Sequence, residues 1–146
     1  MTLEGPEIFV IGTPSPGCGG RYWITVRLTT ECGITGYGEV HASAVGPQAM
    51  QAVIPAVFHR HMQGESPENI EMMFRRAYSS GFTQRPDPTV MGAFSGLEIA
   101  AWDILGKARR YPAGHTWTVH ACRGDPAGRR GRGASAPVVR RTRAPR

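Results

Sequence analysis

Few side chains in this sequence have the types and spacing that metal or acid–base chemistry needs. Glu39 and His41 lie two residues apart, so on a strand they would share one face and could supply two metal ligands. No third ligand is apparent beside them, which favours a structural role. His59 and His61 are also two residues apart, but on a helix that spacing makes the side chains diverge, and we expect both to face solvent.

Neither the glycine-rich stretch nor the cysteines predict a binding site. Residues 17–20 read Gly-Cys-Gly-Gly, which resembles a phosphate-binding loop but lacks the P-loop lysine and the dinucleotide spacing. The three cysteines, Cys18, Cys32 and Cys122, form no Cys-x-x-Cys pair, so they predict neither a disulfide framework nor a tetrahedral zinc site. A reducing, cytoplasmic location is expected.

The net positive charge of the chain comes from its C-terminal tail. The whole chain carries 17 Lys or Arg against 11 Asp or Glu, but residues 1–109 hold 8 against 10, a net charge of −2. Residues 110–146 hold 9 Arg against one Asp, a net charge of +8. The Arg-Gly pattern of residues 129–133 resembles an RNA-binding patch, but the tail has few interleaved aromatic residues. Because of this basic tail, nucleic-acid binding is kept as the alternative function.

Alternating and apolar segments predict three strands near the N-terminus. Residues 7–11 are a short apolar strand, and residues 22–30 alternate between apolar and polar side chains. Gly33 supplies the positive φ that a tight hairpin needs, and residues 34–43 return as the partner strand. Together these segments predict a three-stranded antiparallel meander.

Helical spacing follows in three segments. Residues 47–62 form the first predicted helix; Ser66 is placed to cap the second, with Pro67 at its first position. Residues 90–107 form the third, in which three glycines predict close backbone contact. The predicted apolar stripes are Met50, Val53, Ile54, Val57, Phe58 and Met62; Ile70, Met73, Phe74 and Ala77; and Val90, Phe94, Leu97, Ala101, Ile104 and Leu105. Strands followed by about three helices indicate an α+β fold.

The chain changes character after residue 109. Residues 110–146 are rich in Arg, Gly, Ala and Pro without apolar periodicity, so we expect a disordered tail behind one folded domain, residues 1–109. Such composition also arises when a GC-rich gene is translated out of frame, and a frameshift near Ala108 is a hypothesis that sequencing the locus would test. No segment approaches the roughly 18 apolar residues of a membrane helix.

Three patterns together resemble the N-terminal capping domain of the mandelate racemase and muconate-lactonizing branch of the enolase superfamily. They are the hairpin of residues 27–39, the Gly-Glu-Ser-Pro helix start at residues 64–67, and the helix of residues 95–107. Members of that family normally continue into a long barrel domain. Here Ala108 leads into the arginine-rich tail, so the barrel is expected to be missing, and 146 residues are too few to include it.

The resemblance implies a division of labour between two domains. In the family the barrel carries magnesium-binding carboxylates and the acid or base groups of an Mg-dependent lyase or isomerase, which abstracts a proton beside a carboxylate and stabilises an enediolate. No catalytic residue or metal ligand carries over to this chain, whose only lysine is Lys107. We therefore expect the chain itself to bind no cofactor, with Mg required only in the full-length family.

Two capping loops do carry over, residues 12–21 and 41–47, and the resemblance implies that they face the substrate. Arg21 could pair with a carboxylate, while His41 or Ser43 could hydrogen-bond a sugar-acid hydroxyl. Tyr22 and Arg85 are further candidates. The alternative is that Arg21 is a solvated loop charge, that His41 merely ends a strand, and that Arg85 forms a surface pair with Asp87.

The leading interpretation is the capping and substrate-specificity domain of an acid-sugar dehydratase or cycloisomerase, inactive without its barrel. Its small-molecule partner would be an acid sugar held together with a barrel, and no membrane partner is expected. The uncovered barrel-facing surface favours self-association. The alternatives are a module that binds nucleic acid or a protein through the basic tail, and a scaffold that complements a separately encoded barrel.

Overall fold

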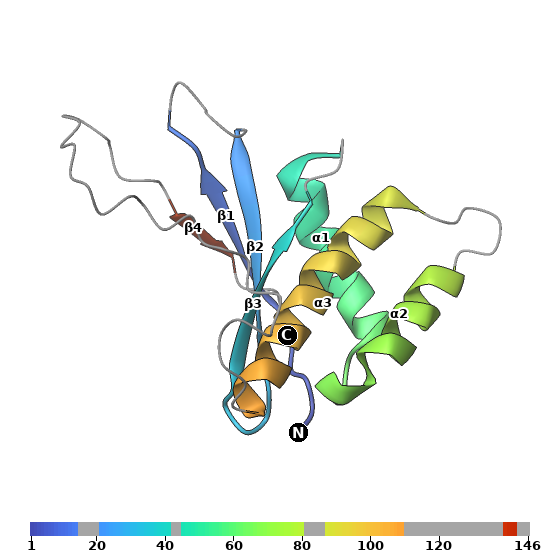
Figure 1. Ribbon diagram of the computed structural model, residues 1–146. Coiled ribbons are helices and arrows are strands. Elements are labelled where there is room, and N and C mark those ends of the chain that lie inside the picture. The colour runs from blue at the N-terminus through green and yellow to red at the C-terminus, as the bar shows by residue number, and fades with distance from the viewer. Residues whose placement is uncertain (15–20, 42–44, 81–86, 110–138, 143–146) are drawn as a thin grey trace, which may run out of the picture.

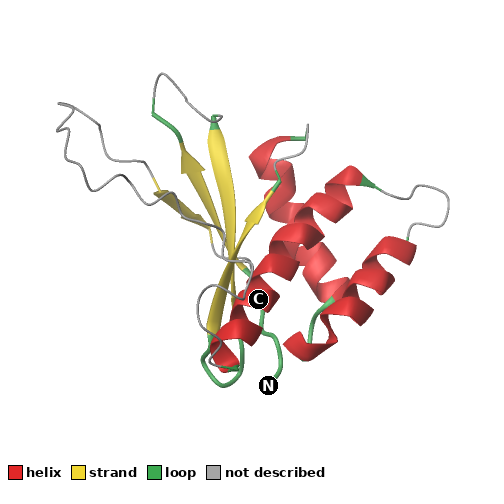
Figure 2. Ribbon diagram, in the orientation of Figure 1, coloured by secondary structure: helices red, strands yellow, loops and turns green. Residues whose placement is uncertain are grey.

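The computed structural model describes residues 1–14, 21–41, 45–80, 87–109 and 139–142. An antiparallel sheet forms one layer, and helices cover one of its faces (Figures 1 and 2). Helix α3 packs on β3 and β2, and helices α1 and α2 pack against α3. In the part of the chain that the structure describes, no helix is both long and apolar enough to cross a membrane.

The predicted meander is confirmed as strands β1 (Glu7–Gly12), β2 (Tyr22–Thr29) and β3 (Thr35–Val40). The register pairs Ile8 with Val26 and Val26 with Gly38. Because side chains alternate between the two faces of a strand, the buried residues of β1 and β2 point toward the helices. Strand β3 is shorter than predicted and ends at Val40.

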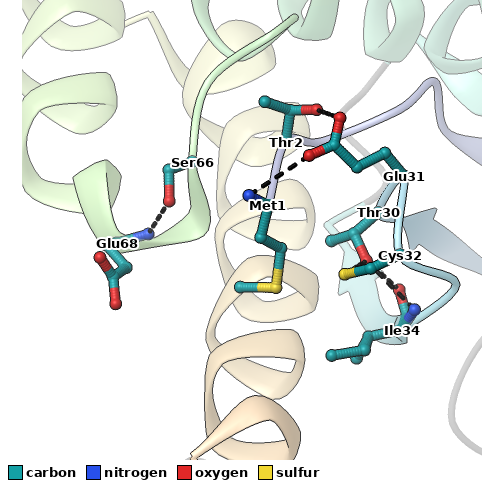
Figure 3. A network of polar contacts seen from close by, with 8 residues as sticks. All are labelled: Met1, Thr2, Thr30, Glu31, Cys32, Ile34, Ser66 and Glu68. Atoms are coloured by element: carbon teal, nitrogen blue, oxygen red, sulfur yellow. Dashed lines mark hydrogen bonds and ion pairs between the residues drawn. The ribbon is translucent and has the colours of Figure 1, made fainter.

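The hairpin between β2 and β3 is closed by polar contacts (Figure 3). Gly33 has φ of 82°, as the sequence predicts for this turn. The Thr30 hydroxyl lies 3.3 Å from the Cys32 sulfur, and it accepts a hydrogen bond from the Ile34 N–H at 3.1 Å. Nearby, the Glu31 carboxylate accepts a hydrogen bond from Thr2 Oγ1 at 2.7 Å, and its other oxygen lies 3.3 Å from the N-terminal ammonium of the chain. These contacts hold the start of the chain against the turn.

Three predicted helices are present. Helix α1 spans Gly46–His61, and α2 spans Ile70–Ser79 after a 3-10 turn, η1 (Pro67–Asn69). Ser66 accepts a hydrogen bond from the Glu68 N–H at 3.3 Å (Figure 3). It therefore caps the 3-10 turn, whereas the sequence predicts that it caps the second helix directly; the N-cap position of α2 is Asn69. Helix α3 spans Pro88–Ala108.

Helix α3 approaches β3 closely, and this explains why glycine stands at two positions inside the helix, Gly92 and Gly96. A Cβ atom on Gly96 would overlap a methyl group of Val40 and lie 2.9 Å from the Glu39 carbonyl oxygen. On the strand side, a Cβ on Gly38 would overlap the Gly96 carbonyl oxygen. The predicted backbone contact of α3 is therefore confirmed, and its partner surface is a pair of glycines on β3, Gly36 and Gly38.

The core lies between the sheet and the helices, and the predicted stripes supply most of it. Two expectations were wrong. Phe74 remains 37% exposed at the edge of its stripe, where its ring meets Phe94 edge-on and stacks on Tyr78. His61 is buried, while His59 is exposed and hydrogen-bonds Gln63.

A fourth strand, β4 (Val139–Thr142), pairs antiparallel with β1 and completes the sheet order β3-β2-β1-β4. These residues lie in the tail, for which the sequence predicts no strand. Periodicity cannot reveal so short a strand, because it is set by pairing with β1 and not by a local pattern.

Candidate functional site

Arg21 and Tyr22 lie where β1 and β2 meet at one end of the sheet. Tyr22 pairs with Gly12, and the Arg21 carbonyl oxygen accepts a hydrogen bond from the Thr13 N–H at 3.1 Å. Tyr22 is half-buried and packs against the core, whereas Arg21 is exposed. Among the described carboxylates, none forms an ion pair with Arg21. Its backbone is therefore fixed while its guanidinium is open to an external anion.

His41 lies at the same end of the sheet. It directly follows Val40, which pairs with Ile24, two residues beyond Tyr22 along β2. The side chain of His41 is exposed, and a Cβ on Gly92 would lie 3.3 Å from the His41 carbonyl oxygen. The first turns of α3 therefore pack behind His41. Arg21, Tyr22 and His41 therefore lie at one end of the sheet.

Helix α3 begins at this end of the sheet as well, beside the end of β3 (Figure 1). Asp87 caps it, because Asp87 Oδ1 accepts hydrogen bonds from the Thr89 N–H at 2.7 Å and from the Val90 N–H at 3.1 Å. The predicted helix begins later, at residue 90, although Asp followed by Pro at the first helical position is a recognisable helix start. Ser43 and Arg85, the other two candidates, lie outside the described residues.

The opposite end of α3 is fastened to β3 by a polar cluster. The Asp103 carboxylate accepts hydrogen bonds from the Tyr37 N–H at 3.0 Å and from Lys107 Nζ at 2.7 Å. Lys107 Nζ also donates to the Thr35 carbonyl oxygen at 2.8 Å and lies 5.4 Å from the centre of the Tyr37 ring. Asp103 thus bonds the neighbouring backbone of β3. These charges anchor the helix to β3.

Helix α3 also carries a half-buried carboxyl group, that of Glu98. Burial raises the pKa of Glu98, a hydrogen bond from Trp102 opposes this shift, and the charge of Glu71 adds to it. Shifted pKa values often mark functional sites. Here, however, within the described ranges, no three His, Cys, Asp or Glu side chains gather in a way that could hold a metal ion. Glu39 and His41 therefore lack a third ligand among the described residues. The described residues do not fit a magnesium ion.

Comparisons with known proteins agree with this architecture. Residues 17–114 match the family described as mandelate racemase / muconate lactonizing enzyme, N-terminal domain. Among solved structures, the mandelate racemase/muconate lactonizing enzyme from Sulfitobacter sp. is 72% identical, with a TM-score of 0.72 over 75% of this chain and 28% of that chain. A mandelate racemase/muconate lactonizing enzyme-like protein from Roseovarius sp. TM1035 is 69% identical, also with a TM-score of 0.72 over 75% of this chain and 28% of that chain.

Curated relatives include named dehydratases. A D-galactonate dehydratase family member from Pseudarthrobacter chlorophenolicus is 33% identical over 113 residues, which are 77% of this chain and 25% of the relative. A D-mannonate dehydratase from Xanthomonas oryzae pv. oryzicola is 29% identical over 99 residues, 65% of this chain and 22% of the relative. The chain thus spans about a quarter of the length of the relatives it matches. The chain belongs to the mandelate racemase/muconate lactonizing enzyme family, and the matching part is that family's N-terminal domain.

Proposed function

We propose that residues 1–109 act as the capping domain of an acid-sugar dehydratase, closing over a barrel domain that carries the reacting groups. The observation that supports this most is that Arg21 and His41, both exposed, lie with Tyr22 at one end of the sheet. The chain is also similar to a D-galactonate dehydratase family member and a D-mannonate dehydratase. An exposed guanidinium can bind the carboxylate of a sugar acid through two parallel hydrogen bonds. The exposed imidazole of His41, at the same end of the sheet, can bond a hydroxyl.

The proposed role is binding and specificity. Dehydration of a sugar acid requires a base and a group that stabilises the enediolate, and the magnesium implied by the resemblance supplies the latter when bound. The described residues do not fit that ion, so their role is to bind and orient the substrate. We expect the chain alone to have no dehydratase activity, because binding groups without converging catalytic groups stabilise substrate and transition state alike.

A chimera tests the proposal. The N-terminal domain of the Sulfitobacter relative would be replaced with residues 1–109 of this chain, since 72% identity favours a matched domain interface. The parent, the chimera and the 146-residue chain would be assayed with Mg²⁺ on a panel of sugar acids that includes galactonate and mannonate. We expect activity in the parent and the chimera, and none in the chain alone.

Point variants of the chimera locate the binding role. Arg21→Ala should raise KM for the acid at least about tenfold, because it removes both charge-assisted hydrogen bonds to the carboxylate. His41→Ala should have a smaller effect on KM. Arg75→Ala is the matched control, because the Arg75 side chain is 80% exposed on α2 and pairs only loosely with Glu71 at 3.6 Å.

Several outcomes would contradict the proposal. Turnover by the purified chain alone would show that it needs no barrel. A folded chimera that is inactive on the parent's substrate would argue against the capping role, and an equal KM change in Arg21→Ala and Arg75→Ala would argue against a binding role for Arg21. A parent that dehydrates no sugar acid would contradict the substrate class.

A further inference from the structure

Strand β1 would be an edge of the sheet if β4 did not cover it. The sheet order is β3-β2-β1-β4, and β4 comes from a part of the chain far from the other three strands in sequence (Figures 1 and 2). Edge strands present unpaired N–H and C=O groups, which favour pairing with another chain. Strand β1 reads Glu-Ile-Phe-Val-Ile-Gly, an apolar segment of the kind that needs such protection.

The register shows which backbone groups of β1 face this edge. The Thr13 N–H donates to the Arg21 carbonyl oxygen, so Thr13 and Arg21 form a hydrogen-bonded pair. Hydrogen-bonded pairs recur at every second residue of an antiparallel ladder, so Phe9 and Thr25 form another. The intervening residues, Ile8 and Val10, therefore direct their N–H and C=O groups away from β2.

These outward groups are the ones that β4 meets. Val10 pairs with Arg140, and Ile8 pairs with Thr142. By the same alternation, the N–H groups of Arg140 and Thr142 face β1, whereas the N–H of Arg141 faces away from it. The docked segment is thus recognised through its backbone, in the manner of β-strand addition.

We propose that the β1 edge is a strand-docking site, and that the chain's own Val139–Thr142 segment fills it as a latch that keeps β1 from pairing with a second copy. Charge favours this occupant, because residues 110–146 carry +8 and residues 1–109 carry −2. Tethering within one chain also gives the segment an effective concentration of order millimolar, well above that of a second copy in dilute solution. The family match ends at residue 114 and does not include this strand.

Two proline variants of the full chain provide a matched test. Arg140→Pro removes the N–H that faces β1, whereas Arg141→Pro removes one that faces away. Both variants lose one arginine, and proline at position 141 favours the extended backbone that residue 140 already has. Amide hydrogen exchange, followed by NMR, would report on Ile8 and Val10, with Phe9 as the internal reference that bonds β2.

The latch predicts a specific pattern of exchange. In the parent chain, Ile8 and Val10 should be protected. Arg140→Pro should accelerate their exchange at least tenfold and leave Phe9 within about twofold, while Arg141→Pro should stay close to the parent. Free exchange of Ile8 and Val10 in the parent, or equal acceleration in both variants, would overturn the proposal.

Concentration separates the chain's own segment from a second copy. Pairing within one chain predicts that Val10 exchange is unchanged across a tenfold dilution, whereas protection that is lost on dilution would show pairing between copies and overturn the proposal. Arg140→Pro should also sediment as a larger species than Arg141→Pro at high concentration, because its β1 edge is open. Identical sedimentation of the two variants would contradict the protective role.

Discussion

The contact between β3 and α3 makes Gly38→Ala the most informative single change in this domain. A Cβ at position 38 would overlap the Gly96 carbonyl oxygen and lie 2.9 Å from the Ala100 nitrogen. Both obstacles are backbone atoms of α3, so no side-chain rotation can relieve the overlap. The helix as a whole would have to move away from the sheet.

The expected cost is large for one methyl group. Overpacking a core typically costs about 1–3 kcal/mol, and we place Gly38→Ala at about 3 kcal/mol because the obstacle is rigid. Moving α3 would also loosen its contacts with the sheet, where Leu97 and Ile104 are completely buried. Since about 1 kcal/mol shifts the melting temperature of a domain of this size by roughly 4–8 °C, the expected loss is roughly 12–24 °C.

Thermal and urea unfolding, followed by circular dichroism at 222 nm, would measure the effect. Gly12→Ala is the matched control, because it lies in the same sheet and a Cβ there would meet nothing within 4 Å. The control should be neutral or stabilise the domain by up to about 1 kcal/mol by restricting the unfolded chain. If Gly38→Ala melted within about 2 °C of Gly12→Ala, the close approach of α3 to β3 would be refuted.

Three further changes test the cap of α3 and two buried ionisable groups. Asp87→Ala should destabilise the domain by about 1–2 kcal/mol in urea unfolding because two N–H groups lose their acceptor, and Asp87→Asn should recover most of the loss. Burial, reinforced by the charges of Arg60 and Arg76, lowers the pKa of His61 below its usual 6.5, so the unfolded state binds the proton first. Stability should therefore fall as pH drops below 6.5, by at most about 1.4 kcal/mol per pH unit, and urea unfolding at pH 7.5 and 5.5 should show a flatter dependence for His61→Gln. Burial raises the pKa of Glu98 above its usual 4.5, so its contribution is retained below pH 4.5 and is lost as pH rises through the folded-state value. Glu98→Gln should then raise the melting temperature at pH 7 but leave it nearly unchanged at pH 4.

Much of the fold could be predicted because its elements are marked locally. Alternation along β2, the cap at Ser66 and the apolar stripe of α3 each follow from a few neighbouring residues. The glycines of α3 also predicted close backbone contact, which Gly96 makes. What they could not predict was the partner, because nothing local to Gly38 shows which helix will cross it.

The errors have equally specific causes. Successive residues of a helix are rotated by about 100°, so the side chains of His59 and His61 lie on nearly opposite faces. Because His59 is exposed, His61 lies on the buried face, and the prediction that both face solvent was wrong. Phe74 belongs to the stripe of α2 but lies at its margin, where burial depends on how far α3 extends over it. Strand β4 depends on pairing with β1, many residues away, and on nothing in its own four residues.

The candidate site could be predicted only in part, and packing explains which part. The positions of Arg21 and Tyr22 follow from the β1–β2 register, which the alternation of β2 fixes. The position of His41 depends in addition on α3, because Gly92 lets the helix pass close behind its backbone. The glycines that would weaken an isolated α3 are therefore the residues that let the helix pass close behind His41 at the end of β3. It follows that the geometry of the proposed binding edge is set by the backbone contact between β3 and α3, and that a change at this contact can alter ligand binding without touching a ligand.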